Sequence, residues 1–126
     1  MLLDIQQTMK FIGAEYSMDK SRNEIFYHYC IVRNDLPIGV TAAQLVHAAG
    51  ESNPGGQHSH AVVLGVPKEN LLDIEVKLSD AGITHVAVRE PDSPYNGELM
   101  AIGIVPVFRS KNKDLRRIVS GLKLLR

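Results

Sequence analysis

The segment Tyr27–Ala49 constrains the fold more than any other part of the chain, because it has the pattern of a strand, a turn and a helix in immediate succession. Its first part, YHYCIVR, is rich in the aromatic and β-branched residues that favour strands. The NDLP sequence at 34–37 has turn chemistry, and proline is tolerated in a first helical turn. Either Asp35 or Thr41, which has capping-box spacing to Gln44, is expected to cap the helix that follows.

This helix has two distinct faces on a 3.6-residue period. The first is apolar and is expected to pack on the core: Ile38, Ala42, Leu45 and Ala49. The second places an amide and an imidazole beside the helix N-terminus: Val40, Gln44, His47 and Glu51. Unpaired N–H groups and the helix dipole favour a carbonyl oxygen, a phosphate or an oxyanion there. The second face is therefore a candidate site, although the small residues of this helix also suit simple close packing on a sheet.

The rest of the chain predicts a mixed α/β domain. After a loop at 53–57, the expected elements are a strand at 60–66, a helix at 68–81, strands at 84–89 and 99–106, and a helix at 114–124. Because the strands are apolar without alternation, we expect helices on both faces of the sheet. The loop between the last two strands permits an antiparallel pair. The predicted fold class is α/β, a three-layer α/β/α sandwich with a mixed four-stranded sheet.

A length of 126 residues suits one domain, which we place at 26–126. Residues 1–25 form an N-terminal extension with apolar residues at helical spacing, and we expect an amphipathic helix that packs on the domain or on a partner chain. The sequence has no run near the roughly 18 apolar residues that span a bilayer, and polar residues stand where a signal peptide needs an apolar stretch. We therefore expect a cytoplasmic protein without membrane contact.

The charges are distributed unevenly although the net charge is zero. Residues 1–106 carry seven Lys or Arg against thirteen Asp or Glu, whereas 107–126 carry seven against one, Asp114. This basic tail, which includes Lys123, is suited to phosphates, and such binding would weaken steeply with salt. A solvated helix face that balances an acidic body explains the pattern equally well.

Several blocks of the sequence resemble the archaeal and eukaryotic class of peptidyl-tRNA hydrolases. The family pattern R-x-D-L, followed by G-K-x-A-A-Q-x-x-H-A, is matched over Arg33–Ala48 apart from its lysine. AIGIVP at 101–106 is similar to the family's last strand, and SGLKLL at 120–125 is similar to its terminus. The resemblance covers about residues 26–126, and the family's α/β/α sandwich around a mixed four-stranded sheet agrees with the predicted fold.

The resemblance implies hydrolysis of the ester between a peptidyl or other acyl group and tRNA, by a homodimer. It implies four catalytic residues: Gln44, His47, Glu90 and Asp92. It also implies four substrate-binding residues: Arg33, Asp35, Thr41 and Lys123. Water would be the nucleophile, Glu90 or Asp92 would orient or deprotonate it with help from His47, and Gln44 with the helix N-terminus would hold the carbonyl oxygen. We expect no cofactor.

Three positions depart from the family pattern. Val40 stands in place of a lysine, Met100 in place of a threonine, and Glu90 nearest to an aspartate. Loss of one well-placed electrostatic donor costs about 10²- to 10³-fold in rate. The EPD sequence at 90–92 and the absent lysine are more similar to the family's divergent branch, the peptidyl-tRNA hydrolase domain-containing proteins. Two functions stay open: an active hydrolase, and a catalytically silent module that binds tRNA or a protein.

A metal site is the least favoured alternative. His58 and His60 would lie on the same side of an extended segment, and His85 would join them only if the strands are adjacent. Two histidines are too few for a closed zinc site. We therefore predict no metal.

Overall fold

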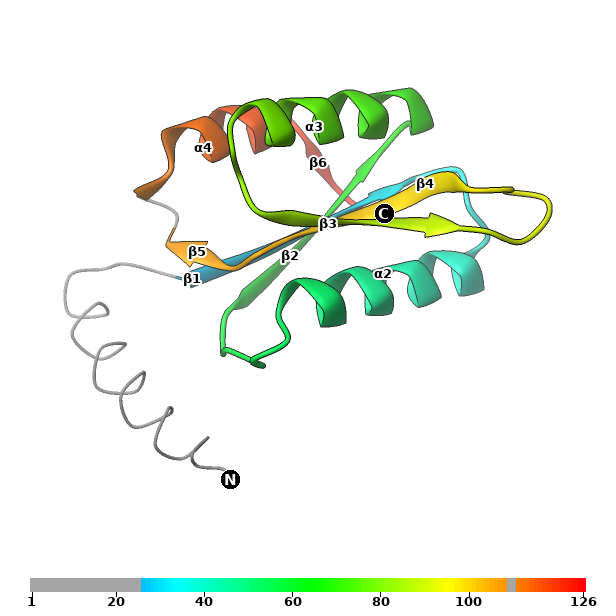
Figure 1. Ribbon diagram of the computed structural model, residues 1–126, viewed down its shortest axis with the longest axis horizontal. Helices are drawn as coiled ribbons and strands as arrows, with labels where there is room; N and C mark the ends of the chain where they lie inside the picture. Colours follow the sequence, from blue (N-terminus) through cyan, green and yellow to red (C-terminus); the bar gives the residue numbers. More distant parts are fainter. Residues whose placement is uncertain (1–25, 109–110) are drawn as a thin grey trace.

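A computed structural model describes residues 26–108 and 111–126 of the chain. The helix predicted within the N-terminal extension at 1–25 lies outside the described residues. The described part is a mixed α/β fold (Figure 1). Its elements are β1 Phe26–Arg33, α2 Ile38–Ser52, β2 His60–Val66, α3 Lys68–Asp80, β3 His85–Glu90, β4 Glu98–Ile104, β5 Val107–Phe108, α4 Lys113–Val119 and β6 Lys123–Leu124.

The strands form one mixed sheet in the order β3-β4-β1-β2-β6, and β5 pairs with the beginning of β1. β1 is parallel to β2, as predicted for strands joined by a helix, and β3 is antiparallel to β4. The sheet described here has six strands, so the expected number of four is wrong. The two additional strands, β5 and β6, are two residues long each. Pairings this short leave no hydrophobic period in the sequence.

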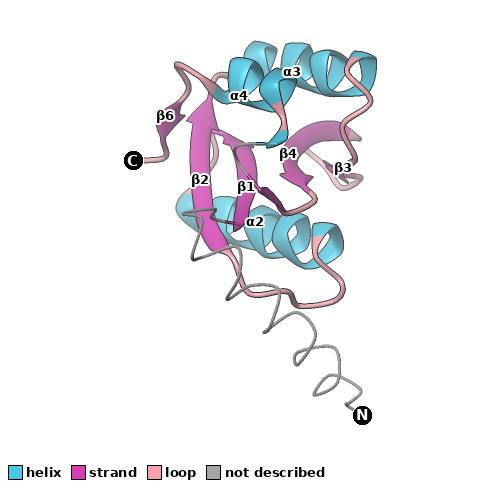
Figure 2. Ribbon diagram, turned by 90° about the vertical axis from the view of Figure 1, so that its left-hand side faces the viewer, coloured by secondary structure: helices cyan, strands magenta, loops and turns pink. Residues whose placement is uncertain are grey.

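Helices lie on both faces of the sheet, with α2 on one face and α3 and α4 on the other (Figures 1 and 2). Alternate residues of β1 therefore enter two different cores. Tyr29 and Ile31 pack on the side of α3 and α4, whereas Cys30 and Val32 pack on the side of α2. Burial raises the pKa of the Cys30 thiol to about 11.

The position of α2 is set by its close approach to Gly103 on β4. A Cβ atom at Gly103 would overlap the carbonyl oxygen of Ala48 and the hydroxyl of Ser52. The buried face of α2 is accordingly the series Gln44, Ala48 and Ser52. The predicted core face is wrong in part, because Ile38 is 89% exposed and Ala42 is exposed, while Leu45 and Ala49 are partly buried. Small side chains, rather than the largest apolar ones, allow the helix to lie this close to the sheet.

The last helix is shorter than predicted. Asn112 caps α4 by accepting a 2.9 Å hydrogen bond from the Leu115 N–H, and the helix ends at Val119. The chain then turns at Gly121, whose φ is +86°, a conformation that favours glycine. Residues 123–124 form β6, which pairs antiparallel with β2. The prediction of a helix over 114–124 is therefore wrong after residue 119. Within the described ranges, no helix is long and apolar enough to cross a membrane.

Candidate functional site

A hollow of about 280 Å³ lies where the beginning of α2 meets the loop between β3 and β4. Both segments lie at the same end of the molecule (Figure 1). The hollow is lined by Gly39, Val40, Ala43, Gln44, Glu90, Asp92, Ser93 and Tyr95. Three residues predicted as catalytic from the sequence, Gln44, Glu90 and Asp92, thus come together here, although Gln44 is distant in sequence from the other two.

Gln44 and Glu90 are joined directly. Gln44 is 4% exposed, and its Nε2 donates a 3.0 Å hydrogen bond to Glu90 Oε1. The other carboxylate oxygen, Oε2, accepts a 3.2 Å hydrogen bond from the Asp92 N–H. The loop is closed behind it by a 2.7 Å bond from the Gly97 N–H to the Glu90 carbonyl oxygen. These contacts fix the orientation of the Glu90 carboxylate at the wall of the hollow.

The same wall includes the N-terminus of α2. The first backbone bond into the helix runs from the Thr41 N–H to the Pro37 carbonyl oxygen, at 2.9 Å. Within the described ranges, the helix has no side-chain cap and no acidic residue in its first turn. The N–H groups of residues 38–40 therefore keep their hydrogen-bonding capacity and the positive end of the helix dipole. Such an end favours a carbonyl oxygen or an oxyanion.

Neither residue predicted to cap α2 does so. The Thr41 hydroxyl donates to the Pro37 carbonyl oxygen at 3.0 Å instead of accepting from the helix. Asp35 is engaged by Arg33, which donates from Nε to Oδ1 at 2.8 Å and from Nη2 to Oδ2 at 2.9 Å. This two-point contact has the planar geometry that guanidinium and carboxylate groups prefer.

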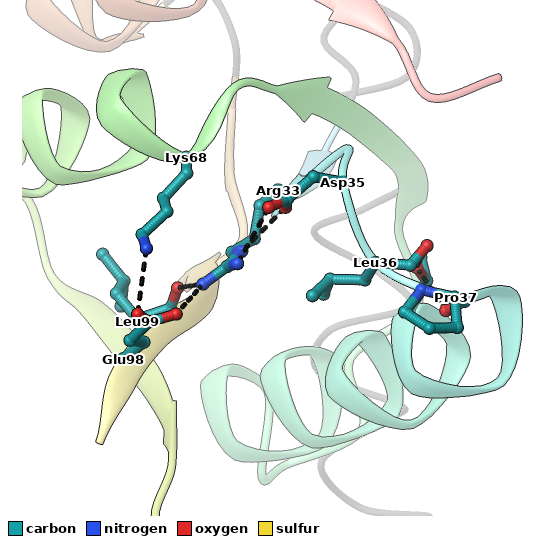
Figure 3. A network of polar contacts seen from close by, with 8 residues as sticks. Arg33, Asp35, Leu36, Pro37, Lys68, Glu98 and Leu99 are labelled. Atoms are coloured by element: carbon teal, nitrogen blue, oxygen red, sulfur yellow. Dashed lines mark hydrogen bonds and ion pairs between the residues drawn. The ribbon is translucent and has the colours of Figure 1, made fainter. Parts of the chain in front are cut away.

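Arg33 is the centre of a charged network beside the hollow (Figure 3). It is 4% exposed, and its Nη1 also donates to Glu98 Oε1 at 2.8 Å. Lys68 Nζ bonds the second oxygen of Glu98 at 2.9 Å. The Arg33 guanidinium lies 5.6 Å from the centroid of the Tyr95 ring, which lines the hollow. Arg33 therefore supports the wall of the hollow through Tyr95. Its two carboxylate partners, Asp35 and Glu98, belong to the same chain and have partly exposed side chains.

In this network the pKa values of Arg33, Asp35 and Glu98 are shifted in the directions that keep these three groups charged. Hydrogen bonds from Arg33 lower the pKa of Asp35, and hydrogen bonds from Arg33 and Lys68 lower the pKa of Glu98. The hydrogen bond to Asp35 raises the pKa of Arg33 further above its already high value. The four charges cancel, so the network adds no net charge to the neighbouring hollow.

Two predicted site residues lie elsewhere. His47 has a side chain that is 61% exposed, 3.9 Å from Glu51, and it is not among the residues that line the hollow. Gln44 and His47 are separated because α2 turns the face of Gln44, Ala48 and Ser52 towards the sheet. Lys123 lies in β6, at the edge of the sheet opposite to β3 and Glu90. The predicted grouping of an amide with an imidazole is thus wrong.

Three members of the site and its supporting network were missed from the sequence: Tyr95, Glu98 and Lys68. Tyr95 and Glu98 reach Arg33 through the β3–β4 hairpin, and Lys68 reaches Glu98 because α3 begins near the end of β1. Sequence periodicity does not predict such contacts between distant segments. The pairing of Arg33 with Asp35 had a signal, because an arginine two residues before an aspartate at a strand end can fold back onto it.

The histidines considered as metal ligands do not form a cluster. His85 Nδ1 lies 2.7 Å from the Ile83 carbonyl oxygen. Across the described parts of the chain, no group of three or more His, Cys, Asp or Glu is placed to hold a metal ion.

Comparison with known proteins yields a fold relationship. No protein-family model matches the chain, and no curated protein matches it. A solved structure of a protein of unknown function from Agrobacterium tumefaciens strain C58 is similar, with a TM-score of 0.55 and 16% sequence identity. The match covers 80% of this chain and 98% of that chain. At this level of identity, the likeness shows a shared fold.

Proposed function

We propose that the protein hydrolyses the ester between a peptidyl or other acyl group and the 3′ ribose of tRNA. The observation that carries the proposal is the hydrogen bond between Gln44 and Glu90, beside the uncapped N-terminus of α2. The hollow therefore contains both an oriented carboxylate, that of Glu90, and backbone N–H donors for an oxyanion. The tRNA part of the proposal is supported by the resemblance of Arg33–Ala48 to the peptidyl-tRNA hydrolase pattern.

In this proposal Glu90 is the general base. Water bound in the hollow gives a proton to Glu90 and attacks the ester carbonyl carbon, and the resulting oxyanion accepts hydrogen bonds from the N–H groups at the start of α2. The bond between the carbonyl carbon and the ribose oxygen then breaks, and the ribose oxygen receives the proton from Glu90. Gln44 is a positioning residue because it holds the carboxylate, and Asp92 adds a second negative charge that orients the water.

The proposal extends to the architecture, the location and the partners of the protein. We propose that the sheet, α2, and α3 with α4 form the three-layer α/β/α sandwich of the resembling family, and that the protein acts as a cytoplasmic homodimer that binds tRNA. The basic residues of α4 lie across the sheet from α2 (Figure 1). They would therefore contact a part of the tRNA that is remote from the ester.

A second candidate function is a catalytically silent tRNA-binding module. The observation that favours it is the lining of the hollow, in which the described residues include two acids and no Lys or Arg. Val40 occupies the place of the lysine in the resembling pattern and lines this hollow. An active enzyme of this kind would stabilise the oxyanion with backbone N–H groups alone.

Hydrolysis of purified peptidyl-tRNA tests the first candidate. The wild-type protein should release peptide well above the uncatalysed rate, and Glu90→Gln should lower the rate about 10²- to 10⁴-fold, the usual contribution of a general base. Glu51→Gln is the matched control, because Glu51 is an exposed acid on α2 that lies outside the hollow. Wild-type turnover no higher than that of Glu90→Gln would exclude the hydrolase.

The Val40→Lys variant separates the two candidates. If the wild type binds tRNA without hydrolysis and Val40→Lys gains hydrolysis, the module is a silenced relative of an enzyme. Binding to tRNA should weaken steeply as salt increases, because phosphate contacts release counterions. Absent or salt-insensitive tRNA binding would exclude the binding module.

A further inference from the structure

A second hollow lies on the other face of the sheet, between the beginnings of β1 and β2 and the C-terminal end of α4. Its volume is about 620 Å³, within the range of about 300–1,000 Å³ found for ligand pockets. It forms because α4 ends at Val119 and the chain turns away at Gly121. None of the residues proposed to act on the ester lines this hollow.

Aromatic rings form one wall of this second hollow. Tyr27 and His60 are register partners on β1 and β2, with ring centroids 5.8 Å apart and ring planes inclined at 46°. Tyr29 packs edge-on against Tyr27, at 5.8 Å and 87°. Neighbouring rings on a sheet surface provide a platform on which a planar heteroaromatic ring can stack.

Arg116 lines the same hollow and brings a positive charge that no described side chain balances. Three other arginines are paired with carboxylates at 2.8–3.1 Å: Arg33, Arg89 and Arg117. Arg116 is exposed, and within the described ranges its side chain has no such pair. The described lining of this hollow contains no acidic residue, in contrast to the hollow at Glu90. The chemistry therefore favours an anionic ligand.

We propose that the second hollow binds a nucleotide, whose base stacks against Tyr27 and His60 and whose phosphate pairs with Arg116. Stacking on aromatic side chains and charge-assisted bonds from arginine are the two contacts that single-stranded nucleic acids and nucleotides share. The ligand is either a free mononucleotide or one nucleotide of a single-stranded RNA. The site lies across the sheet from Gln44 and Glu90, so it does not depend on the proposed hydrolysis.

Nuclear magnetic resonance titration of ¹⁵N-labelled full-length protein tests this site. The probes are AMP, adenosine, inorganic phosphate and a single-stranded RNA tetranucleotide. AMP should shift the backbone amides of Ala61, Ser120 and Gly121 without shifting those of Ala43 and Gln44, and it should bind more tightly than adenosine or phosphate. Binding at the same amides by the tetranucleotide alone would identify RNA as the source of the nucleotide and supports the proposal.

Arg116 and Arg89 provide a matched pair of arginine variants. Arg116→Gln should weaken AMP or RNA binding about tenfold, the loss expected for one charge-assisted phosphate contact. Arg89→Gln should leave binding unchanged, because Arg89 pairs with Glu75 and lies outside this hollow. His60→Ala, which removes part of the platform, should weaken AMP but not inorganic phosphate. Absence of shifts with every probe, shifts at these amides by inorganic phosphate at concentrations as low as those of AMP, or equal losses in both arginine variants would overturn the proposal.

Discussion

The amide of Gln44 donates a 3.0 Å hydrogen bond to the carboxylate of Glu90, which follows it by 46 residues. The bond joins the buried face of α2 to the end of β3 and satisfies a polar side chain that is 4% exposed. A glutamine at a position that faces a sheet is thus paired rather than simply buried. Its partner stands on the wall of the hollow, where a carboxylate can reach a ligand.

Replacement of Gln44 by leucine should separate positioning from stability. Leucine fills a similar volume, and Glu90 keeps access to water, so we expect a loss of less than about 1.5 kcal/mol in the free energy of unfolding. The value of kcat on peptidyl-tRNA should fall about tenfold with little change in KM, because Glu90 loses the donor that orients it. Urea denaturation and steady-state kinetics measure the two effects. A change in KM alone would show that Gln44 contacts substrate rather than Glu90.

Gly103→Ala should destabilise the fold, because the added methyl group overlaps the backbone of α2 at Ala48. We expect a loss of about 1–3 kcal/mol or more in the free energy of unfolding by urea. Gly50→Ala is the control, since Gly50 is an exposed helical residue with open space around it. Alanine there should stabilise by about 0.5–1 kcal/mol. Equal effects at the two glycines would contradict the close approach of α2 to β4.

Asp35→Asn should cost far more stability than Asp114→Asn. The first removes the negative charge and one of the two acceptor oxygens that the buried Arg33 contacts, and hydrogen bonds to charged groups contribute about 1.5–3 kcal/mol each. The second breaks an exposed pair between Asp114 and Arg117, for which about 0–1 kcal/mol is typical. Denaturant unfolding at neutral pH measures both. Similar small losses would mean that Arg33 is held by Glu98 alone.

His28 should make the protein less stable in mild acid. Its Nε2 lies 2.7 Å from the buried Ser52 hydroxyl, and burial lowers the pKa of His28 below its ordinary value of 6.5. The folded protein therefore binds this proton less well than the unfolded chain, so its stability is full above about pH 6.5 and is lost as the pH falls from there to the folded pKa. Below the folded pKa the loss from His28 is complete.

The free energy of unfolding measured between pH 7.5 and 5 checks this assignment. His28→Gln should flatten the decline, whatever its effect on stability at pH 7.5. His47→Gln, at an exposed position of α2, should leave the decline as in the wild type. A profile for His28→Gln that still falls like the wild type would assign the acid sensitivity to another group.

The sequence predicted the strands and helices that carry a hydrophobic period, and it predicted the parallel β1–α2–β2 connection. It failed where contacts between distant segments decide the structure. The face of α2 that turns inward is set by Gly103, 55 residues after Ala48, and the hydrophobic period of α2 does not predict this contact. The end of α4 depends on the pairing of residues 123–124 with β2, which overrides the helical pattern of the tail.

The site was only partly predicted, because it too depends on contacts between distant segments. Gln44 and Glu90 were predicted from the sequence and lie together. His47 was predicted on the same helical face as Gln44, but α2 packs on the sheet with Gln44 inward and leaves His47 exposed. Asp35, predicted from the sequence to bind substrate, is held at two points by Arg33 in the structure. Tyr95 and Glu98 were not named, because their roles arise only when the β3–β4 hairpin brings them to Arg33.

The most direct test of the central claim is the single-turnover rate of peptidyl-tRNA hydrolysis with enzyme in excess over substrate, because this rate reports the chemical step apart from product release. The wild-type rate constant should exceed that of Glu90→Gln by about 10²- to 10⁴-fold, while both proteins bind the tRNA equally well. Equal rate constants for the two proteins under saturating binding would contradict the assignment of Glu90 as the base of a hydrolase.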